Sequence, residues 1–311
     1  MQIFKNVNTS KGVREPYVAT IGFFDGVHCG HRYLLDYVRR EARRRGAGSL
    51  VITFPDSPSN VLNPSIKLPL LTTPKEKIQL LHETGIDIVV LIPFTIGLSN
   101  LTAEEFMKDI LKTRLGVDTL VMGYDHRFGK QIDGEELDYE SLGRDAGITV
   151  RRYQSLEINN DGTVLSVSSS SIRSSLLEGA IHSANSCLGY NYAMEGRVVN
   201  GHHIGKSIGF PTANLQVENN KLIPANGVYC VMVTTEDGKE FKGMLNIGKR
   251  PTLDNGSDRT VEVHILDFND DLYGQTLRTS FLRYIRPERR FDSIEELRNQ
   301  LMIDRKSCMD V

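Results

Sequence analysis

A change in the pattern of apolar runs near residue 186 constrains the fold of this chain more than any other feature. Before it, short and almost wholly apolar runs alternate with amphipathic stretches of helical period. Apolar strands separated by helices are typical of a parallel sheet that is covered on both faces. The expected strands are Tyr17–Phe23, Ser49–Phe54, Ile86–Pro93 and Asp118–Gly123, and the expected helices are His31–Arg45, Pro74–Glu83 and Ala103–Arg114.

After residue 186, the apolar runs follow one another through turn residues, with no helical stretch between them. Asp237-Gly238, which separates two of the runs, is a strong hairpin signal. The pattern predicts a small antiparallel β-barrel with one terminal helix, where Ser293 and Glu296 form a capping box. We therefore expect two domains, residues 1–185 and residues 186–311. The expected strands of the second are Val198–Val199, Gly227–Thr234, Lys239–Ile247, Thr260–Phe268 and Leu277–Ile285, and the expected helix is Ser293–Asp304.

Composition argues against several classes of protein. The 311 residues include 37 Lys and Arg against 39 Asp and Glu, a near-neutral balance that does not suit a general nucleic-acid binder. No apolar run is long enough to span a bilayer and no signal pattern opens the sequence, so we expect a cytoplasmic protein. The cysteines have neither zinc nor disulfide spacing, and we expect all of them to be reduced thiols. They are Cys29, Cys187, Cys230 and Cys308.

The first candidate site lies between the first strand and the first helix, in residues 22–31. Open α/β sheets bind ligands at this place, and glycines beside a helix N-terminus let backbone N–H groups approach an anion. Two histidines three residues apart can stabilise charge on an α-phosphate during in-line attack. A zinc site formed by the histidines and an aspartate, or a plain glycine-rich turn, is the alternative. The candidates are His28 and His31 as catalytic residues, and Gly22, Phe23, Asp25 and Gly30 as ATP- or phosphate-binding residues.

Two motifs resemble the nucleotidyltransferase superfamily that transfers AMP or CMP. The His-x-Gly-His sequence at 28–31 is similar to its signature, and Ser169–Arg173 resembles its second motif, Ser-[Ser/Thr]-x-x-Arg. Serines at a helix start and an arginine in the first turn form a second phosphate clamp, here Ser169, Ser170 and Arg173. Taken alone, the serine run reads as a solvated linker and the arginine as a surface charge. The resemblance implies a Rossmann-like nucleotidyltransferase domain in the N-terminal half.

A second glycine-rich stretch, residues 201–214, opens the β half. The Gly-Lys-Ser at 205–207 is not a Walker A loop, because Asn200 stands where that loop needs glycine and no helical pattern follows. The stretch can still present backbone N–H groups to a phosphate. A turn followed by a half-buried strand is the alternative. The candidate phosphate-binding residues are Gly205, Lys206 and Gly209.

Oxygen-bearing side chains follow this stretch. Thr212 and Asn214 lie two residues apart on an extended segment, project to the same side and are candidate ligands of Mg²⁺ beside ATP phosphates. In the strand 260–268, alternation places Glu262 away from the face that carries the valines. A carboxylate near a metal-bound nucleotide can accept a proton from an attacking alcohol, so Glu262 is the candidate catalytic base. A solvated glutamate is the alternative.

Five motifs, in order, resemble bacterial riboflavin kinase, and the whole chain resembles the bifunctional riboflavin kinase/FAD synthetase family. The motifs are Gly205–Asn214, Asn246-Ile247-Gly248-x-x-Pro251, Val261–Phe268, Asp271–Gly274 and the stretch from Ile285 to Phe291. The resemblance implies that the β half phosphorylates riboflavin to FMN and the N-terminal half adenylylates FMN to FAD, both with ATP and Mg²⁺. It also implies flavin binding by Asp125, Arg127 and Asn246. We expect riboflavin, FMN and ATP as partners of a monomer or weak oligomer, with no nucleic acid or membrane partner.

The sequence departs from the family at three places. Residues 54–58 read Phe-Pro-Asp-Ser-Pro where the family often has Phe-Glu-Pro-His-Pro, His126 stands where Phe is usual, and Lys206 where Arg is common. Because the added Asp56 carboxylate would repel phosphates, we expect FMN to accumulate before FAD appears. The alternative is that Asp56 points to solvent and changes nothing. The alternative functions are a riboflavin kinase with weak or absent FAD synthetase activity, a single-activity nucleotidyltransferase and a flavin-binding regulatory module.

Overall fold

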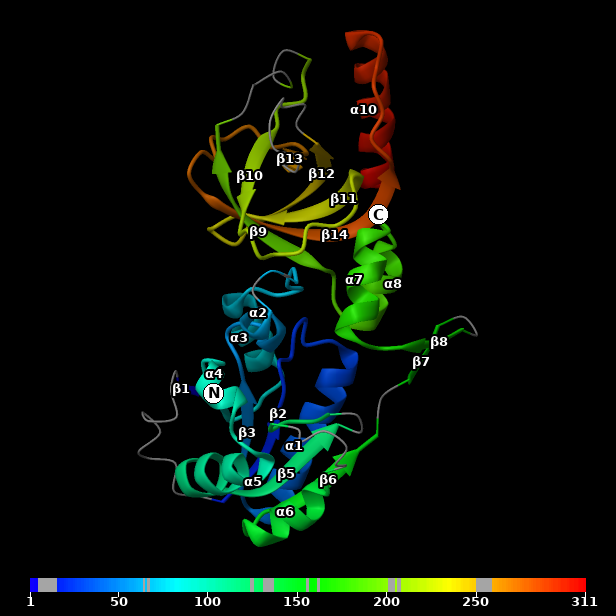
Figure 1. Cartoon of the computed structure of the whole chain (residues 1–311). Coiled ribbons are helices and arrows are strands. Elements are labelled where there is room, and N and C mark those ends of the chain that lie inside the picture. Colours follow the sequence, from blue (N-terminus) through cyan, green and yellow to red (C-terminus); the bar gives the residue numbers. More distant parts are fainter. Residues whose placement is uncertain are drawn as a thin grey trace. The chain divides into compact units, whose positions relative to one another are not determined.

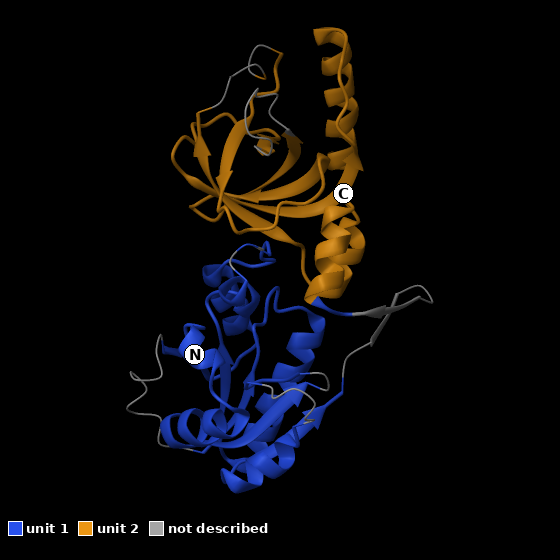
Figure 2. Ribbon diagram, viewed as in Figure 1, with its two compact units in different colours: residues 1–168 blue, residues 169–311 orange. Residues whose placement is uncertain are grey.

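The chain forms two compact units, residues 1–168 and residues 169–311 (Figure 2). The computed structural model describes residues 1–4, 16–63, 65, 68–123, 126–130, 137–154, 157–160, 163–200, 205, 208–249 and 259–311. We expected the domain boundary between residues 185 and 186, but the second compact unit begins earlier, at Ser169. Its first elements are two short helices, α7 (Ser169–Leu177) and α8 (Ile181–Leu188). These helices pack on each other, and α8 also packs on a strand of the barrel, which groups both with the second unit.

The first unit is built on a sheet covered by helices (Figure 1). Its strands are β1 (Gln2–Phe4), β2 (Tyr17–Ile21), β3 (Gly48–Thr53), β4 (Ile88–Leu91), β5 (Val117–Gly123) and β6 (Thr149–Tyr153), followed by a hairpin of β7 (Glu157–Asn160) and β8 (Thr163–Ser166). Its helices are α1 (Cys29–Arg45), α2 (Pro58–Leu62), α3 (Pro74–Glu83), α4 (Ile96–Ser99), α5 (Ala103–Glu105), the π-helical η2 (Phe106–Arg114) and α6 (Tyr139–Asp145).

The order of the sheet, β1-β4-β3-β2-β5-β6, confirms the parallel sheet predicted from the sequence. Strands β2 and β4 are buried along their whole length, as expected where helices cover both faces; α1 packs on β2 and β3, and η2 packs on β5. The single helix expected over 103–114 is instead a short α5 that continues as a π-helix.

The second unit is a closed antiparallel barrel, which confirms the predicted fold of the C-terminal half. Its strands are β9 (Ala193–Val199), β10 (Ala213–Val217), β11 (Gly227–Thr234), β12 (Glu240–Lys249), β13 (Arg259–Ile265) and β14 (Thr276–Arg286), and its terminal helix is α10 (Ile294–Met309). The barrel order is β10-β13-β12-β11-β14-β9, and α10 packs on β11 and β12. Alternate residues such as Tyr229, Val263 and Phe281 are fully buried. Within the described residues, no helix has the length and apolar character to cross a membrane.

Two expectations about this unit are corrected. Cys230 of β11 and Cys308 of α10 form a disulfide with their Cα atoms 5.2 Å apart, so the expectation of reduced thiols is wrong for this pair. Spacing could not reveal it, because the packing of α10 on β11 joins cysteines 78 residues apart. The capping box at Ser293 is half formed. Its hydroxyl accepts from the N–H of Glu296, but the Glu296 carboxylate accepts from the N–H of Asp292.

Candidate active sites in the two units

The carboxyl end of β2 leads into the loop that carries the predicted histidines. His28 is the N-cap of α1, which begins at Cys29 rather than at His31 as predicted. The Nδ1 atom of His28 accepts the backbone N–H of His31 at 3.3 Å, and the two rings stack with centroids 3.5 Å apart. Because Nδ1 is an acceptor, the proton of a neutral His28 lies on Nε2, where it can be donated to a ligand.

His31 is held as a neutral imidazole. Burial lowers the pKa of His31 well below its ordinary value, and the neighbouring His28, Lys77 and His126 lower it further. Its Nδ1 atom is buried and has no hydrogen-bond partner among the described residues. A neutral imidazole in the first turn of a helix can donate its N–H to a phosphate oxygen without carrying a charge itself.

Asp25 holds this loop in place. Its buried carboxylate accepts from the backbone N–H groups of Leu71 and Thr72, both at 3.0 Å, and from the Thr72 hydroxyl at 3.1 Å. Among the described residues, no three His, Cys, Asp or Glu side chains are arranged to bind a metal. A Cβ on Gly30 would lie 3.3 Å from the His28 ring, so glycine at this position leaves room for the imidazole.

Gly22 and Phe23 directly follow the last residue of β2. The N–H of Gly22 donates to the carbonyl of Ile52 at 3.0 Å. The carbonyl of Phe23 accepts two side-chain hydrogen bonds, one from the Thr53 hydroxyl at 3.0 Å and one from Lys77 Nζ at 3.1 Å. Lys77 could not be singled out from the sequence, because its amphipathic helix predicts only which face is buried.

The second phosphate motif lies in α7, at the start of the second unit. Ser169 and Ser170 occupy the first turn of this helix, and Arg173 is buried. Val167, near the end of the first unit, lies beside the histidine loop, with its carbonyl 3.8 Å from the position of a Cβ on Gly30.

The remaining N-terminal candidates are only partly placed. Arg127 is exposed, and Asp125 lies outside the described residues. At the first family departure, Asp56 is exposed, whereas Ser57 is buried and hydrogen-bonded to the Ser59 hydroxyl at 2.7 Å.

In the second unit, one row of residues crosses five neighbouring strands. Asn214, Glu262 and Asn246 are successive register partners on β10, β13 and β12. Val228 and Arg286 continue the row on β11 and β14. Register partners on adjacent strands point to the same face of a sheet. The row therefore forms a belt on one face of the barrel, with Glu262 between two amide side chains.

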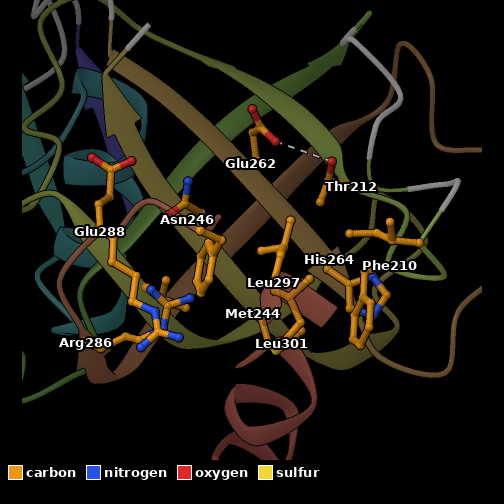
Figure 3. A pocket seen from close by; sticks show the side chains of 15 residues that line it. Phe210, Thr212, Met244, Asn246, Glu262, His264, Arg286, Glu288, Leu297 and Leu301 are labelled. Carbon is orange, nitrogen blue, oxygen red and sulfur yellow. Dashed lines mark hydrogen bonds between the residues drawn. The ribbon is translucent and has the colours of Figure 1, made fainter. Parts of the chain in front are cut away.

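A cavity of about 320 Å³ lies beside this row, between the barrel and α10 (Figure 3). Thr212 and Glu262 form one polar side, and the Thr212 hydroxyl donates to Glu262 Oε2 at 3.4 Å. A cavity that is apolar on one side and polar on the other suits a small molecule with an apolar part and a polar part. The apolar lining is formed by Ile208, Phe210, Met244, Leu297 and Leu301.

His264 fixes the segment that carries Thr212. Its Nδ1 atom lies 2.7 Å from the carbonyl of Pro211 and donates to it, and its ring meets the Phe210 ring edge-on at 5.2 Å. Burial lowers the pKa of His264, and the Pro211 carbonyl partly opposes this shift. His264 was not among the predicted site residues, although the alternation of its strand places it on the same face as Glu262.

An ion pair between Arg286 and Asp304 connects α10 to the barrel. Arg286 donates to Asp304, which is completely buried, and its Nη2 lies 2.8 Å from Asp304 Oδ2. The same helix supplies Leu297 and Leu301 to the cavity. The sequence predicted this terminal helix but could not show which surface of the barrel it covers.

The glycines and oxygen donors predicted near Glu262 are placed as follows. Gly205 closes a turn with Phe210, whose N–H donates to the Gly205 carbonyl at 2.9 Å, and a Cβ at Gly205 would collide with the Phe210 carbonyl. Gly209 has a φ of 85°, a conformation that favours glycine, and Lys206 lies outside the described residues. Thr212 borders the cavity described above, whereas Asn214, the register partner of Glu262, borders a second cavity with Arg259, Thr260 and Val261.

Comparison with known proteins finds a matching family for each of the two units. Family models described as FAD synthetase and riboflavin kinase match residues 10–170 and 188–311. The bifunctional riboflavin kinase/FMN adenylyltransferase of Escherichia coli K12 is 36% identical to this chain, and the match covers 98% of this chain and 96% of that protein. The enzyme of the same name from Listeria monocytogenes is 34% identical, and the match covers 92% of this chain and 90% of that protein. A crystal structure of a macrolide-efflux protein from Streptococcus pneumoniae has a TM-score of 0.86 at 30% identity, covering 100% of this chain and 99% of that one. The chain belongs to the family of bifunctional riboflavin kinase/FMN adenylyltransferases.

Proposed function

We propose that the barrel unit phosphorylates riboflavin to FMN at the cavity beside Glu262. One observation carries this proposal: the Glu262 carboxylate stands where an apolar cavity meets a row of polar side chains. The isoalloxazine ring would occupy the apolar part, between the barrel and α10. The terminal ribityl hydroxyl would then lie at Glu262, with Asn246 beside it.

Glu262 would act as the general base of this phosphoryl transfer. Its carboxylate accepts the proton of the ribityl hydroxyl as that oxygen bonds to the γ-phosphorus of ATP, and the bond from that phosphorus to the β–γ bridging oxygen breaks to release ADP. Thr212 and Asn214 flank Glu262 with hard oxygen donors, a set that fits Mg²⁺. Bound there with ATP, Mg²⁺ would neutralise charge on the phosphate oxygens.

Replacing Glu262 by Gln tests this assignment. Glu262→Gln keeps the shape of the side chain but cannot accept the proton, so FMN formation is expected to fall by about 10²–10⁴-fold. Adenylylation of supplied FMN by the same variant is the internal control and should be unchanged. The matched control is Glu240→Gln, an exposed glutamate on neighbouring β12. Near-wild-type FMN formation by Glu262→Gln would remove Glu262 as the base.

We assign the adenylylation of FMN to the histidine loop of the first unit. A phosphate oxygen of FMN bonds to the α-phosphorus of ATP, the bond to the α–β bridging oxygen breaks, and pyrophosphate leaves. No proton has to be removed, since the attacking phosphate is already ionised. His28 and His31 would donate N–H groups to the α-phosphate oxygens as negative charge develops there. Ser169, Ser170 and Arg173 would hold further phosphate oxygens.

A pair of substitutions at His28 separates its donor role from its capping role. His28→Asn keeps an N-cap acceptor for the N–H of His31, whereas His28→Ala removes it and should destabilise the fold by about 1 kcal/mol more. Both variants lose the Nε2–H donor, so the rate of FAD formation should fall by about 10²–10³-fold in each. Stoichiometric zinc in the purified protein, lost in both variants, would support the metal site instead.

We also propose that the protein is cytoplasmic and is a monomer or weak oligomer. Its partners would be small molecules, without nucleic acid or membrane. Both proposed reactions consume ATP, which supports this location. Cell fractionation and light scattering of the purified chain test the two statements.

A further inference from the structure

Lys77 is an unusual residue because its ammonium group is buried in the first unit. The side chain, on α3, is 1% exposed. Its Nζ donates to the carbonyl of Phe54 at 2.6 Å and to that of Phe23 at 3.1 Å, and it lies 4.0 Å from the centre of the Phe23 ring. Burying a charge costs several kcal/mol unless it is compensated. Two carbonyls and an aromatic face provide that compensation.

The two carbonyls follow the ends of neighbouring strands. Phe23 lies just beyond β2 and Phe54 just beyond β3, and these strands are parallel register partners. Lys77 therefore links the carboxyl ends of the two strands through its hydrogen bonds. The loop that follows β2 is the one that leads to His28.

The loop that leads from β2 to His28 has a strained backbone. Phe24 and Val27 have positive φ angles, 52° and 37°, which cost non-glycine residues about 1–3 kcal/mol each. The segment before α3 holds the loop at Asp25, as described above, and at Gly26, whose N–H donates to the Thr72 hydroxyl at 3.0 Å. Lys77, one turn into α3, holds the start of the same loop at Phe23.

We propose that Lys77 is a positioning residue of the adenylyl transfer, acting through the loop that carries His28 and His31. The inference rests on the proposed function of that loop. The charge of Lys77 also reaches His31, whose pKa it helps to lower. The charged groups that face Lys77 are the carboxylates of Asp25 and Asp56, which raise its pKa against the stronger lowering by burial.

Lys77→Met in the full-length chain is the first test. It removes both hydrogen bonds at nearly constant volume. We expect kcat for FAD formation from FMN to fall by about 10²-fold, as for a misplaced catalytic group, with KM for ATP changed by less than about threefold. Riboflavin kinase activity of the same variant should be unchanged. The matched control is Lys75→Met, an exposed lysine on the same helix, which should leave both activities unchanged.

Titration of His31 gives a readout that a purely structural role would not move. Followed by NMR in Lys77→Met, the pKa of His31 should rise relative to wild type, because a neighbouring positive charge has been removed. Lys77→Gln, which keeps one amide donor but no charge, should show the same rise with a smaller loss of kcat.

Each outcome decides the proposal. It is overturned if both variants keep kcat within about threefold of wild type, or if the pKa of His31 does not move. Loss of folding of the first unit in both variants would assign Lys77 to stability alone and also overturn it. If His28→Asn is inactive and Lys77→Met is fully active, only this proposal fails. If His28→Asn is fully active as well, the proposed function of the loop fails with it.

Discussion

At the scale of single residues, the buried Lys77 makes the stability of the first unit depend on pH. Burial lowers the pKa of Lys77 from 10.5 to about 8. Between these values the folded chain releases the Lys77 proton while the unfolded chain retains it. Because the unfolded state binds more protons, the free energy of unfolding should rise with pH through this window, by at most about 3 kcal/mol.

Calorimetry of the full chain at pH 7 and pH 10 checks this sign. The Tm of wild type relative to Lys77→Met should increase by roughly 6–12 °C between the two pH values for the transition of the first unit. Lys75→Met, which changes an exposed lysine, should keep a constant difference from wild type. A Tm difference between wild type and Lys77→Met that stays constant or narrows with rising pH would contradict the expectation.

Residues differ in how far the sequence reveals them. Glu262 was predicted as the base because alternation places it away from the apolar face of its strand and because its motif resembles that of riboflavin kinase. His264 follows the same alternation, but only the fold shows that Pro211 comes within reach of its ring. Lys77 gives no local signal, because the two carbonyls that it binds belong to segments 23 and 54 residues before it.

At the scale of elements, the disulfide between β11 and α10 should stabilise the barrel unit. It closes a loop with a sequence separation of 78 residues, for which chain entropy gives a stabilisation of about 4 kcal/mol. We expect Cys230→Ser or Cys308→Ser to lower the free energy of unfolding by about 2–4 kcal/mol.

A double-mutant cycle separates the bond from the packing of the two side chains. The disulfide can be lost only once, so Cys230→Ser/Cys308→Ser should be little less stable than either single variant. Unfolding of the four proteins, with thiols counted by alkylation and mass spectrometry, measures this. Additive losses from the two substitutions would show that burial of the side chains, not the bond, stabilises the unit.

Elements with strong periodicity were predicted and short or mixed ones were not. Strands β2 to β5 and helices α1 and α3 follow from apolar runs and helical period. Strand β1 has three residues, too few to show a pattern, and its pairing with β4 depends on the fold. Only the end of β9 was predicted, since Glu195, Gly196 and Arg197 interrupt its apolar pattern. The apolar wall of the cavity beside Glu262 could not be predicted, because Leu297 and Leu301 reach it from α10.

At the scale of the whole molecule, the residues proposed for the two reactions form separate sets, with Glu262 in the barrel and His28 in the first unit. An equimolar mixture of Glu262→Gln and His28→Asn should therefore convert riboflavin to FAD, with FMN released by one variant and taken up by the other. FMN should appear first, and FAD should follow after a lag that shortens as both concentrations rise.

Separation of the flavins over time measures this, with each variant alone as the control. His28→Asn alone should stop at FMN, and Glu262→Gln alone should leave riboflavin unchanged. If the mixture forms no FAD while wild type does, FMN passes between the two reactions only within one chain.

The closure of the barrel also bears on how the protein behaves at high concentration. Each of its described strands is hydrogen-bonded on both sides, so the barrel presents no open β-edge to a second chain. The edges of the parallel sheet are β1, with three residues, and β6, where Arg151 and Arg152 are exposed. Short or charged edges discourage one chain from extending the sheet of another. The described strands of the parallel sheet and of the barrel therefore lack the long apolar edge from which amyloid-like aggregation starts.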